Sequence, residues 1–110
     1  MKYTFIKKGG SYRAVIKKAV DEDTFVVPAG LRIQGITTIQ NTTTDGNLTI
    51  GTVADGDQLV TTVALGTSSG AIAEQTVATA IFSDTTNQTC HINIDSATTI
   101  DMYVVMQKVN

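Results

Sequence analysis

The sequence predicts an all-β protein, an antiparallel β-sandwich or barrel of about eight to ten short strands. Three observations favour this class: apolar and polar residues alternate along most of the chain, turn-forming residues recur at short intervals, and about one residue in six is threonine. Threonine is β-branched and carries a hydroxyl group, so it suits the solvent-facing side of a strand. The 110 residues fit one domain.

The N-terminal region is expected to form two strands joined by a glycine turn. Residues 2–6 alternate and end at KKGG, and residues 11–20 follow as a longer strand. Successive side chains of a strand point to opposite faces. The second strand therefore places Tyr12, Ala14 and Ile16 on one face and Arg13 and Lys17 on the other.

Turns and strands continue through the middle of the chain. The acidic residues 21–23 interrupt the alternation, and residues 24–27 resume it. Residues 28–30 (PAG) then form a turn in which Gly30 is free to adopt a positive φ. Within the long strand 31–40, Gly35 indicates a bulge. The two faces of this strand are expected to hold Leu31, Ile33 and Ile39 on one side and Arg32, Gln34, Thr38 and Gln40 on the other.

Two turns that contain aspartate and glycine follow. Asp45-Gly46 is a hairpin dipeptide that precedes a strand at 48–53. The segment ADGDQ (54–58) leads into a strand at 59–65, and a hairpin there would use a positive φ at Gly56. Asp55 and Asp57 would hold a cation only if a third oxygen donor joined them, because the spacing of an EF-hand loop is absent.

The C-terminal part contains one ambiguous segment and two clear strands. Alanines, Glu74 and Gln75 favour a short helical turn or loop at 71–75, followed by a further strand. Residues 89–94 and 100–109 alternate as strands. Cys90, Ile92, Ile94, Ile100, Met102, Val104 and Met106 are expected to point inward. Tyr103 and Val105 on the opposite face indicate either a central strand or a contact between copies, and they are the candidate oligomer residues.

Basic residues are concentrated at the N-terminus, although the net charge is −2. Six of the eight lysines and arginines precede the first acidic residue, Asp21. Residues 1–20 are therefore either a solvated strand or hairpin, or an arm that docks to an acidic surface, and residues 21–110 form the sandwich of the same single domain. An acidic body argues against binding to nucleic acid. The candidate docking residues of the arm are Lys7, Lys8, Arg13, Lys17 and Lys18.

The residues do not suggest an enzyme. Cys90 and His91 are the only cysteine and histidine, and adjacent strand residues point to opposite faces, so the two side chains cannot pair. We expect no bound metal and no cofactor, since convergent Cys and His ligands are lacking. We also expect no membrane span, because no apolar run approaches about 20 residues. The start of the chain lacks the apolar run of a signal peptide, which indicates synthesis in the cytoplasm.

One segment resembles a known group of proteins. Residues 24–60, TFVVPAGLRIQGITTIQNTTTDGNLTIGTVADGDQLV, are similar to a pattern in virion proteins of tailed bacteriophages, including some crAss-like phages. The closing segment 89–109 resembles the terminal hairpin of those proteins. The resemblance implies a small jelly-roll-like β-sandwich that decorates a capsid or forms the base of a head fibre. It carries over no functional residues, because its motifs are turns.

The resemblance therefore predicts a non-enzymatic structural protein of the virion. Such a protein would bind the major capsid protein, other virion proteins or copies of itself, and would lie on the capsid surface after assembly in the host cytoplasm. The alternative is a carbohydrate- or receptor-binding module of a fibre or adhesin. Aromatic residues make up only 5% of the chain and tryptophan is absent, so stacking platforms for sugar rings are scarce.

Overall fold

The computed structural model describes residues 2–9, 11–77 and 85–108, and this part of the chain is all-β. It contains nine strands and no helix, in agreement with the predicted fold class. The strands are β1 (Lys2–Lys8), β2 (Ser11–Ala19), β3 (Thr24–Val27), β4 (Leu31–Gln40), β5 (Gly46–Gly51), β6 (Val60–Leu65), β7 (Ile72–Gln75), β8 (Gln88–Ile94) and β9 (Ile100–Lys108). Among the described residues no helix is long and apolar enough to cross a membrane.

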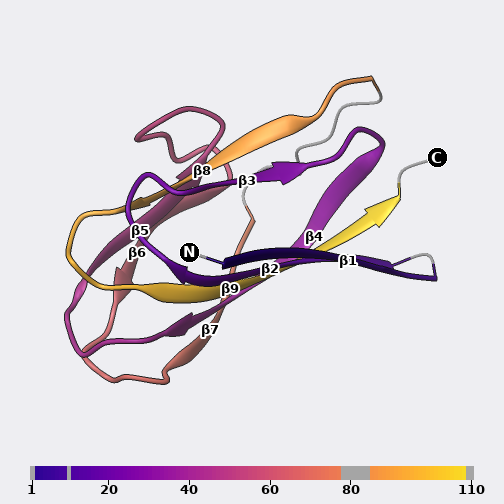
Figure 1. Ribbon diagram of the computed structural model, residues 1–110. Helices are drawn as coiled ribbons and strands as arrows, with labels where there is room; N and C mark the ends of the chain where they lie inside the picture. Colours follow the sequence, from indigo (N-terminus) through magenta and orange to yellow (C-terminus); the bar gives the residue numbers. More distant parts are fainter. Residues whose placement is uncertain (1, 10, 78–84, 109–110) are drawn as a thin grey trace.

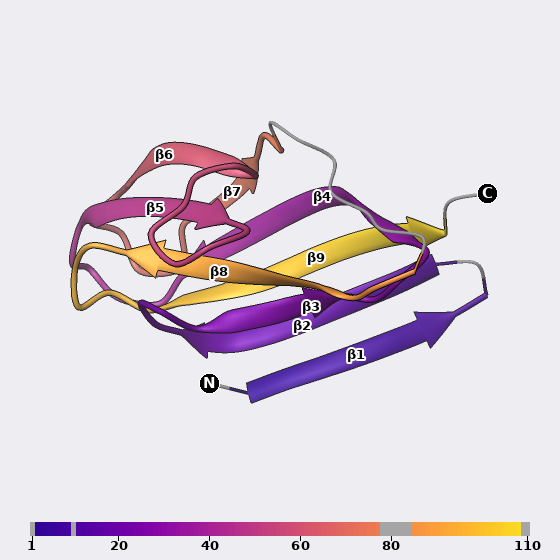
Figure 2. The same ribbon diagram turned by 90° about the horizontal axis from the view of Figure 1, so that it is seen from above.

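The strands form two antiparallel sheets that lie face to face (Figures 1 and 2). The five-stranded sheet has the order β1-β2-β9-β4-β7, and the four-stranded sheet has the order β3-β8-β5-β6. The pairs are nested, since β2 pairs with β9, β3 with β8, β4 with β7, and β5 with β6. One long folded hairpin rolled into two sheets is the jelly-roll arrangement, and β1 is an addition at its edge.

The core lies between the two sheets and is built from alternate residues of the strands. The inward residues predicted on the last two strands are all buried, from Cys90 to Met106. In β2 the core residues are Ala14, Ile16 and Ala19, each 0% exposed. The second strand is therefore part of the sandwich, and only β1 lies outside it.

The bulge in β4 is confirmed, but the predicted faces of this strand are wrong beyond it. The register against β9 shifts by one residue between Ile33 and Gly35. Because side chains alternate with period two, one extra residue exchanges the faces of everything that follows. Thr38 and Gln40 therefore point inward and are 3% and 4% exposed, whereas Ile39 points outward and is half-buried.

The buried Gln40 side chain is accommodated by hydrogen bonds. Its Nε2 donates to the carbonyl oxygens of Thr44, at 3.0 Å, and of Gly66, at 2.5 Å. These bonds tie the end of β4 to the two neighbouring connections. A buried amide with satisfied donors is tolerated in a core, which explains why a glutamine replaces an apolar residue here.

Two further expectations were wrong. Residues 71–75 are not helical, since Ile72–Gln75 is strand β7 and pairs with β4. Asp45-Gly46 does not form a hairpin, because β4 and β5 belong to different sheets and the segment carries the chain from one sheet to the other. The strand expected after residue 75 falls mostly on 78–84, outside the described residues.

Other turns agree with the prediction. Gly30 has a φ of 85°, as expected for the PAG turn, and the hairpin between β5 and β6 is present. In the loop of this hairpin, however, the positive φ belongs to Asp55, at 61°, and not to Gly56. A Cβ atom at Gly56 would lie 2.4 Å from Oε1 of Gln58 and 3.0 Å from the carbonyl oxygen of Val53, so a larger residue there would require these neighbours to move.

Strand β1 is an exposed edge strand. All seven of its residues are exposed, and Tyr3, Phe5 and Ile6 are among the large apolar side chains that solvent reaches. It pairs only with β2, and Figure 2 shows it beyond the edge of the four-stranded sheet. Tyr3 reaches back to that sheet, since its hydroxyl donates to the carbonyl oxygen of Val26 at 3.4 Å.

Candidate functional site

The register of the five-stranded sheet gathers basic residues at one end of the molecule. Lys8 pairs with Ser11, Ser11 with Gln107, and Gln107 with Arg32, so these residues form one row across four strands. This end of the sheet is at the right of Figure 1, where β1 and β9 end. We call it the basic end, and define it by Lys7, Lys8, Arg13, Arg32 and Lys108, all of which are exposed.

An apolar cavity of about 180 Å³ opens at the basic end. The rings of Phe5 and Tyr12 stack on one side of it, with centroids 6.1 Å apart. The Nζ atom of Lys7 lies 5.7 Å from the centroid of the Tyr12 ring, and Lys108 lines the cavity itself. Residues 28–30 and Leu31 complete the wall. The basic end thus combines positive charge with an apolar cavity, a combination suited to a protein surface that offers acidic and apolar groups together.

The charges of the basic end are not neutralised within the described part of the chain. There, the only ion pair joins Lys17 to Asp101, and neither residue belongs to the basic end. Arg32 instead donates from Nη2 to Oε1 of Gln107, at 3.3 Å, which fixes the side chain and leaves its charge uncompensated. These positive charges are therefore available to a partner.

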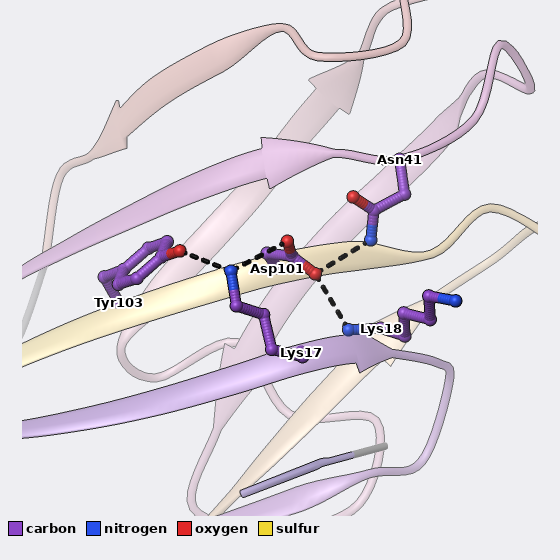
Figure 3. Close-up of polar contacts among 5 residues, drawn as sticks. All are labelled: Lys17, Lys18, Asn41, Asp101 and Tyr103. Carbon is purple, nitrogen blue, oxygen red and sulfur yellow. Dashed lines mark hydrogen bonds and ion pairs between the residues drawn. The ribbon is translucent and has the colours of Figure 1, made fainter. Parts of the chain in front are cut away.

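Lys17 and Lys18 lie at the opposite end of β2, where both form hydrogen bonds within the molecule (Figure 3). The Lys17 ammonium donates to the Tyr103 hydroxyl at 2.5 Å and to Asp101 Oδ2 at 3.4 Å, and these bonds raise the pKa of the lysine. The backbone N–H of Lys18 donates to Asp101 Oδ1 at 2.9 Å. The Asn41 amide donates to the same Asp101 oxygen, also at 2.9 Å. Lys17 is thus engaged within the molecule.

Asp101 is the acceptor at the centre of this cluster. Partial burial acts to raise its pKa, but the bonds from Asn41, Lys18 and Lys17 outweigh burial and hold the pKa below its ordinary value. The cluster ties β2, β9 and the end of β4 together at the outer surface of the sheet. The cluster holds neighbouring strands of the sheet together. It also engages the Lys17 ammonium, which lies at the end of β2 away from the basic end.

The five predicted docking residues are therefore divided between two places. Lys7, Lys8 and Arg13 belong to the basic end, whereas Lys17 and Lys18 lie at the far end of the hairpin. Two members of the basic end, Arg32 and Lys108, were not predicted. They lie far from the N-terminus in sequence, and only the pairing of β4 with β9 brings them there.

Tyr103 and Val105, the candidate oligomer residues, lie on the outer face of the five-stranded sheet. Tyr103 stands between Val15 and Thr37, and Val105 between Arg13 and Gly35. Both side chains are half-buried by these lateral neighbours. The four-stranded sheet covers only the other face of β9, so their apolar surface is shared between lateral packing and solvent.

A second hollow, of about 430 Å³, lies on the outer side of the four-stranded sheet. We call it the acidic hollow. Figure 1 places the β8–β9 turn, which contributes to it, at the end away from the basic end. The hollow is lined by Asp21, Asn47, Thr49, Asp55, Thr62, Asn93, Ile94 and Asp95.

Hydrogen bonds hold the walls of the acidic hollow in place. Asp95 accepts from the backbone N–H of Asn47 at 2.6 Å and from its side-chain amide at 2.9 Å, and these bonds lower the pKa of the carboxyl group. Asp21 accepts from the N–H of Ile94 at 2.9 Å. The Asp55 carboxylate accepts no hydrogen bond from the described residues, so it is free to receive one.

Asn93 fixes the loop that forms one rim of the hollow. Its Oδ1 accepts from the N–H of Asp55 at 3.0 Å, and its Nδ2 donates to the Gly56 carbonyl at 2.8 Å and to Thr49 Oγ1 at 3.1 Å. The loop around Asp55 and Asp57 does not assemble a cation site with other acids. Among the described residues no group of three or more His, Cys, Asp or Glu side chains is placed to hold a metal ion.

Cys90 and His91 occupy opposite faces of β8, as the alternation predicts. Cys90 is 0% exposed, and burial raises the pKa of its thiol to about 12. His91 lies on the outer face, between Thr24 and Gly51. The thiol and the imidazole therefore have no shared site.

Comparison with known proteins gives no relative of this chain. No protein-family profile, no curated protein and no solved structure matches it. The two ends of the sandwich are thus the features on which a functional proposal rests.

Proposed function

We propose that this protein is a non-enzymatic structural protein of a phage virion, which attaches to the capsid exterior or forms the base of a head fibre. The basic end is the docking surface, and an acidic patch of the major capsid protein is its partner. The resemblance of residues 24–60 to virion proteins supports the choice of a capsid shell. The observation that carries the proposal is the basic end itself, where five exposed cations have no ion pair among the described residues and where Lys7 and Lys108 lie at an apolar cavity.

Physical chemistry favours this surface for docking. Positive charges on one face steer a protein toward a surface of opposite sign, and they act over about a Debye length, which is about 10 Å at 0.1 M salt. The cavity between the Tyr12 ring and residues 28–30 accepts an apolar side chain of the partner, since anchors of this kind dominate binding energy.

The direct experiment is co-sedimentation with undecorated shells assembled from the major capsid protein encoded in the same genome. Deletion of residues 1–18 is unsuitable, because it removes the core residues Ala14 and Ile16 and tests folding instead of docking. We therefore choose the charge-reversal variant Lys8→Glu/Arg13→Glu, which changes two exposed residues of the basic end.

The matched control is Lys2→Glu/Lys18→Glu. It changes the same two strands, β1 and β2, by the same total charge, but at the far end of the hairpin. Wild type and control are expected to sediment with the shells, and Lys8→Glu/Arg13→Glu is expected to stay in the supernatant. Equal loss of binding in both variants would show that only net charge matters, and undiminished binding of Lys8→Glu/Arg13→Glu would refute docking through the basic end.

A further inference from the structure

The acidic hollow is a feature that docking through the basic end leaves unused. In the described part of the chain, every lysine and arginine lies on a strand of the five-stranded sheet. Most acidic residues lie instead in the connections around the four-stranded sheet, and three of them line the hollow. The molecule therefore has separated charges, with a positive end and a negative hollow.

The two charged regions lie toward opposite ends of the strands. The β1–β2 turn is at the right of both Figure 1 and Figure 2, whereas the β8–β9 turn, next to Asp95, is at the left of both. If two copies related by a twofold axis made contact through the same charged region, like charges would lie against each other. Lys8 and Arg13 lie on the outer face of the five-stranded sheet and the hollow lies on the outer side of the other sheet, so one pair of copies cannot make both contacts at once. Contact between the positive end of one copy and the negative hollow of another is therefore heterologous, and such contacts extend into chains or close into rings.

We propose that the acidic hollow is the receptor for the basic end of a second copy of this chain, so that copies associate head to tail. The hollow brings Asp21, Asp55 and Asp95 together with the amides and hydroxyls of its wall, and contains no basic residue. Its walls are fixed by the Asp95–Asn47, Asp21–Ile94 and Asn93 hydrogen bonds, so it is formed before a partner arrives. The incoming ammonium and guanidinium groups meet the three carboxyl groups of the hollow.

Lys8 and Arg13 are the residues of the basic end best placed to enter. Both line a cavity of about 270 Å³ beside the hairpin tip, together with Ile6, Ser11 and Tyr12, and both are exposed. The Asp55 carboxylate is the principal acceptor, because Asp95 already binds Asn47 through both oxygens and Asp21 binds Ile94. This contact is independent of the capsid: a copy that is docked to a shell by its basic end leaves its hollow free for the next copy.

The test is sedimentation of the purified protein without shells, over a range of concentration, at about 0.05 M and about 0.5 M salt. The expected result is self-association at low salt and the monomer mass of 11.6 kDa at high salt. Lys8→Glu/Arg13→Glu lowers the formal charge of the basic end from +5 to +1, and Asp55→Asn/Thr62→Lys changes that of the hollow from −3 to −1 without touching Asp21 or Asp95. Each variant alone is expected to be monomeric, and Lys2→Glu/Lys18→Glu is expected to associate like wild type.

Mixing the two variants gives the decisive outcome. The first variant keeps its hollow and the second keeps its basic end, so an equimolar mixture is expected to form a one-to-one heterodimer and nothing larger. Recovery of the complex also shows that both variants are folded. A wild-type protein that is monomeric at both salt concentrations, or variants that fail to complement each other, would overturn the proposal.

Two further outcomes would assign the surfaces differently and likewise overturn it. Association that survives high salt and is lost in Tyr103→Ser/Val105→Ser would place the contact on the outer face of the five-stranded sheet. Association that Asp55→Asn/Thr62→Lys leaves unchanged would assign the hollow to another partner. Because shells are absent from this experiment, its failure leaves the capsid-docking proposal to be decided by co-sedimentation.

Discussion

Replacement of Asn93 by alanine is expected to release the 52–59 loop and to destabilise the whole sandwich. The Asn93 side chain is the only one described that bonds to both Asp55 and Gly56, and the residue is 8% exposed. Its loss leaves the carbonyl group of the buried Gly56 without this donor, which costs about 1–3 kcal/mol. The bonds to Asp55 and Thr49 add about 0.5–1.5 kcal/mol each when lost, although solvent replaces part of this near the rim.

The expected decrease in the free energy of unfolding is therefore about 2–3 kcal/mol. For a domain of this size that corresponds to a melting temperature lower by about 8–12 °C. Circular dichroism with temperature and with urea measures both quantities. The control is Thr89→Ala, an exposed residue on the same outer face of β8, which is expected to change stability by less than about 0.5 kcal/mol.

Hydrogen exchange distinguishes local release of the loop from general weakening. In Asn93→Ala the amide proton of Asp55 loses its acceptor, and it is expected to exchange faster than the amides of the central strand β9. An Asn93→Ala variant as stable as Thr89→Ala, with Asp55 still protected, would refute the reasoning that this side chain holds the loop.

Three further predictions concern a close backbone contact, acid stability and thiol reactivity. In Gly51→Ala the new Cβ would lie 2.4 Å from the backbone carbonyl carbon of Gly56, so we expect the free energy of unfolding in urea to fall by about 1–3 kcal/mol. Gly66→Ala, whose new Cβ would have no atom within 4 Å, should change this free energy by less than about 0.5 kcal/mol. Equal effects of the two substitutions would contradict the prediction. The folded pKa of Asp101 lies below its ordinary value of 3.8, so its ionised form stabilises the fold above that value and the stabilisation disappears as the pH falls through the lowered pKa. Asp101→Asn is therefore expected to be less stable than wild type at pH 7 and to approach it at low pH, and a constant difference across a pH series of urea melts would show that ionisation of Asp101 is irrelevant. The Cys90 thiol, with its pKa raised to about 12 by burial, is expected to resist alkylation near pH 8 until denaturant is added, and rapid labelling of the native protein would count against its buried position.

The strands and the core could largely be predicted from the sequence, because alternation is a local signal. β9 is the clearest case: its inward residues were identified from their spacing, and all are fully buried. The failures arose where pairing between distant segments decides the outcome. Ile72–Gln75 has the composition of a helix but pairs with β4, and the edge of a sheet offers backbone partners that outweigh a weak local preference.

The faces of β4 illustrate a different limit. Gly35 indicated the bulge, but the sequence alone did not show that the residues after it would exchange faces. The register against β9 decides this, and it leaves Thr38 and Gln40 inside. The buried Gln40 is then stabilised by two carbonyl groups from other connections, which local sequence does not reveal.

The candidate site was predictable only in part, for the same reason. Lys7, Lys8 and Arg13 are close in sequence and remain together, but Arg32 and Lys108 join them through the sheet register. Lys17 was indistinguishable from these residues in the sequence, yet Asp101 and Tyr103 engage it. The acidic hollow was not foreseen at all, since its lining residues come from three strands and three connections.

Zero-length cross-linking of wild-type protein to undecorated shells tests the central claim most directly. A carbodiimide joins a lysine amine to a carboxylate only when the two groups are in contact, so the linked lysines identify the docking surface. We expect links from Lys7, Lys8 and Lys108 to acidic residues of the major capsid protein. Links confined to Lys2, Lys17 and Lys18, or no links at all from bound protein, would contradict docking through the basic end.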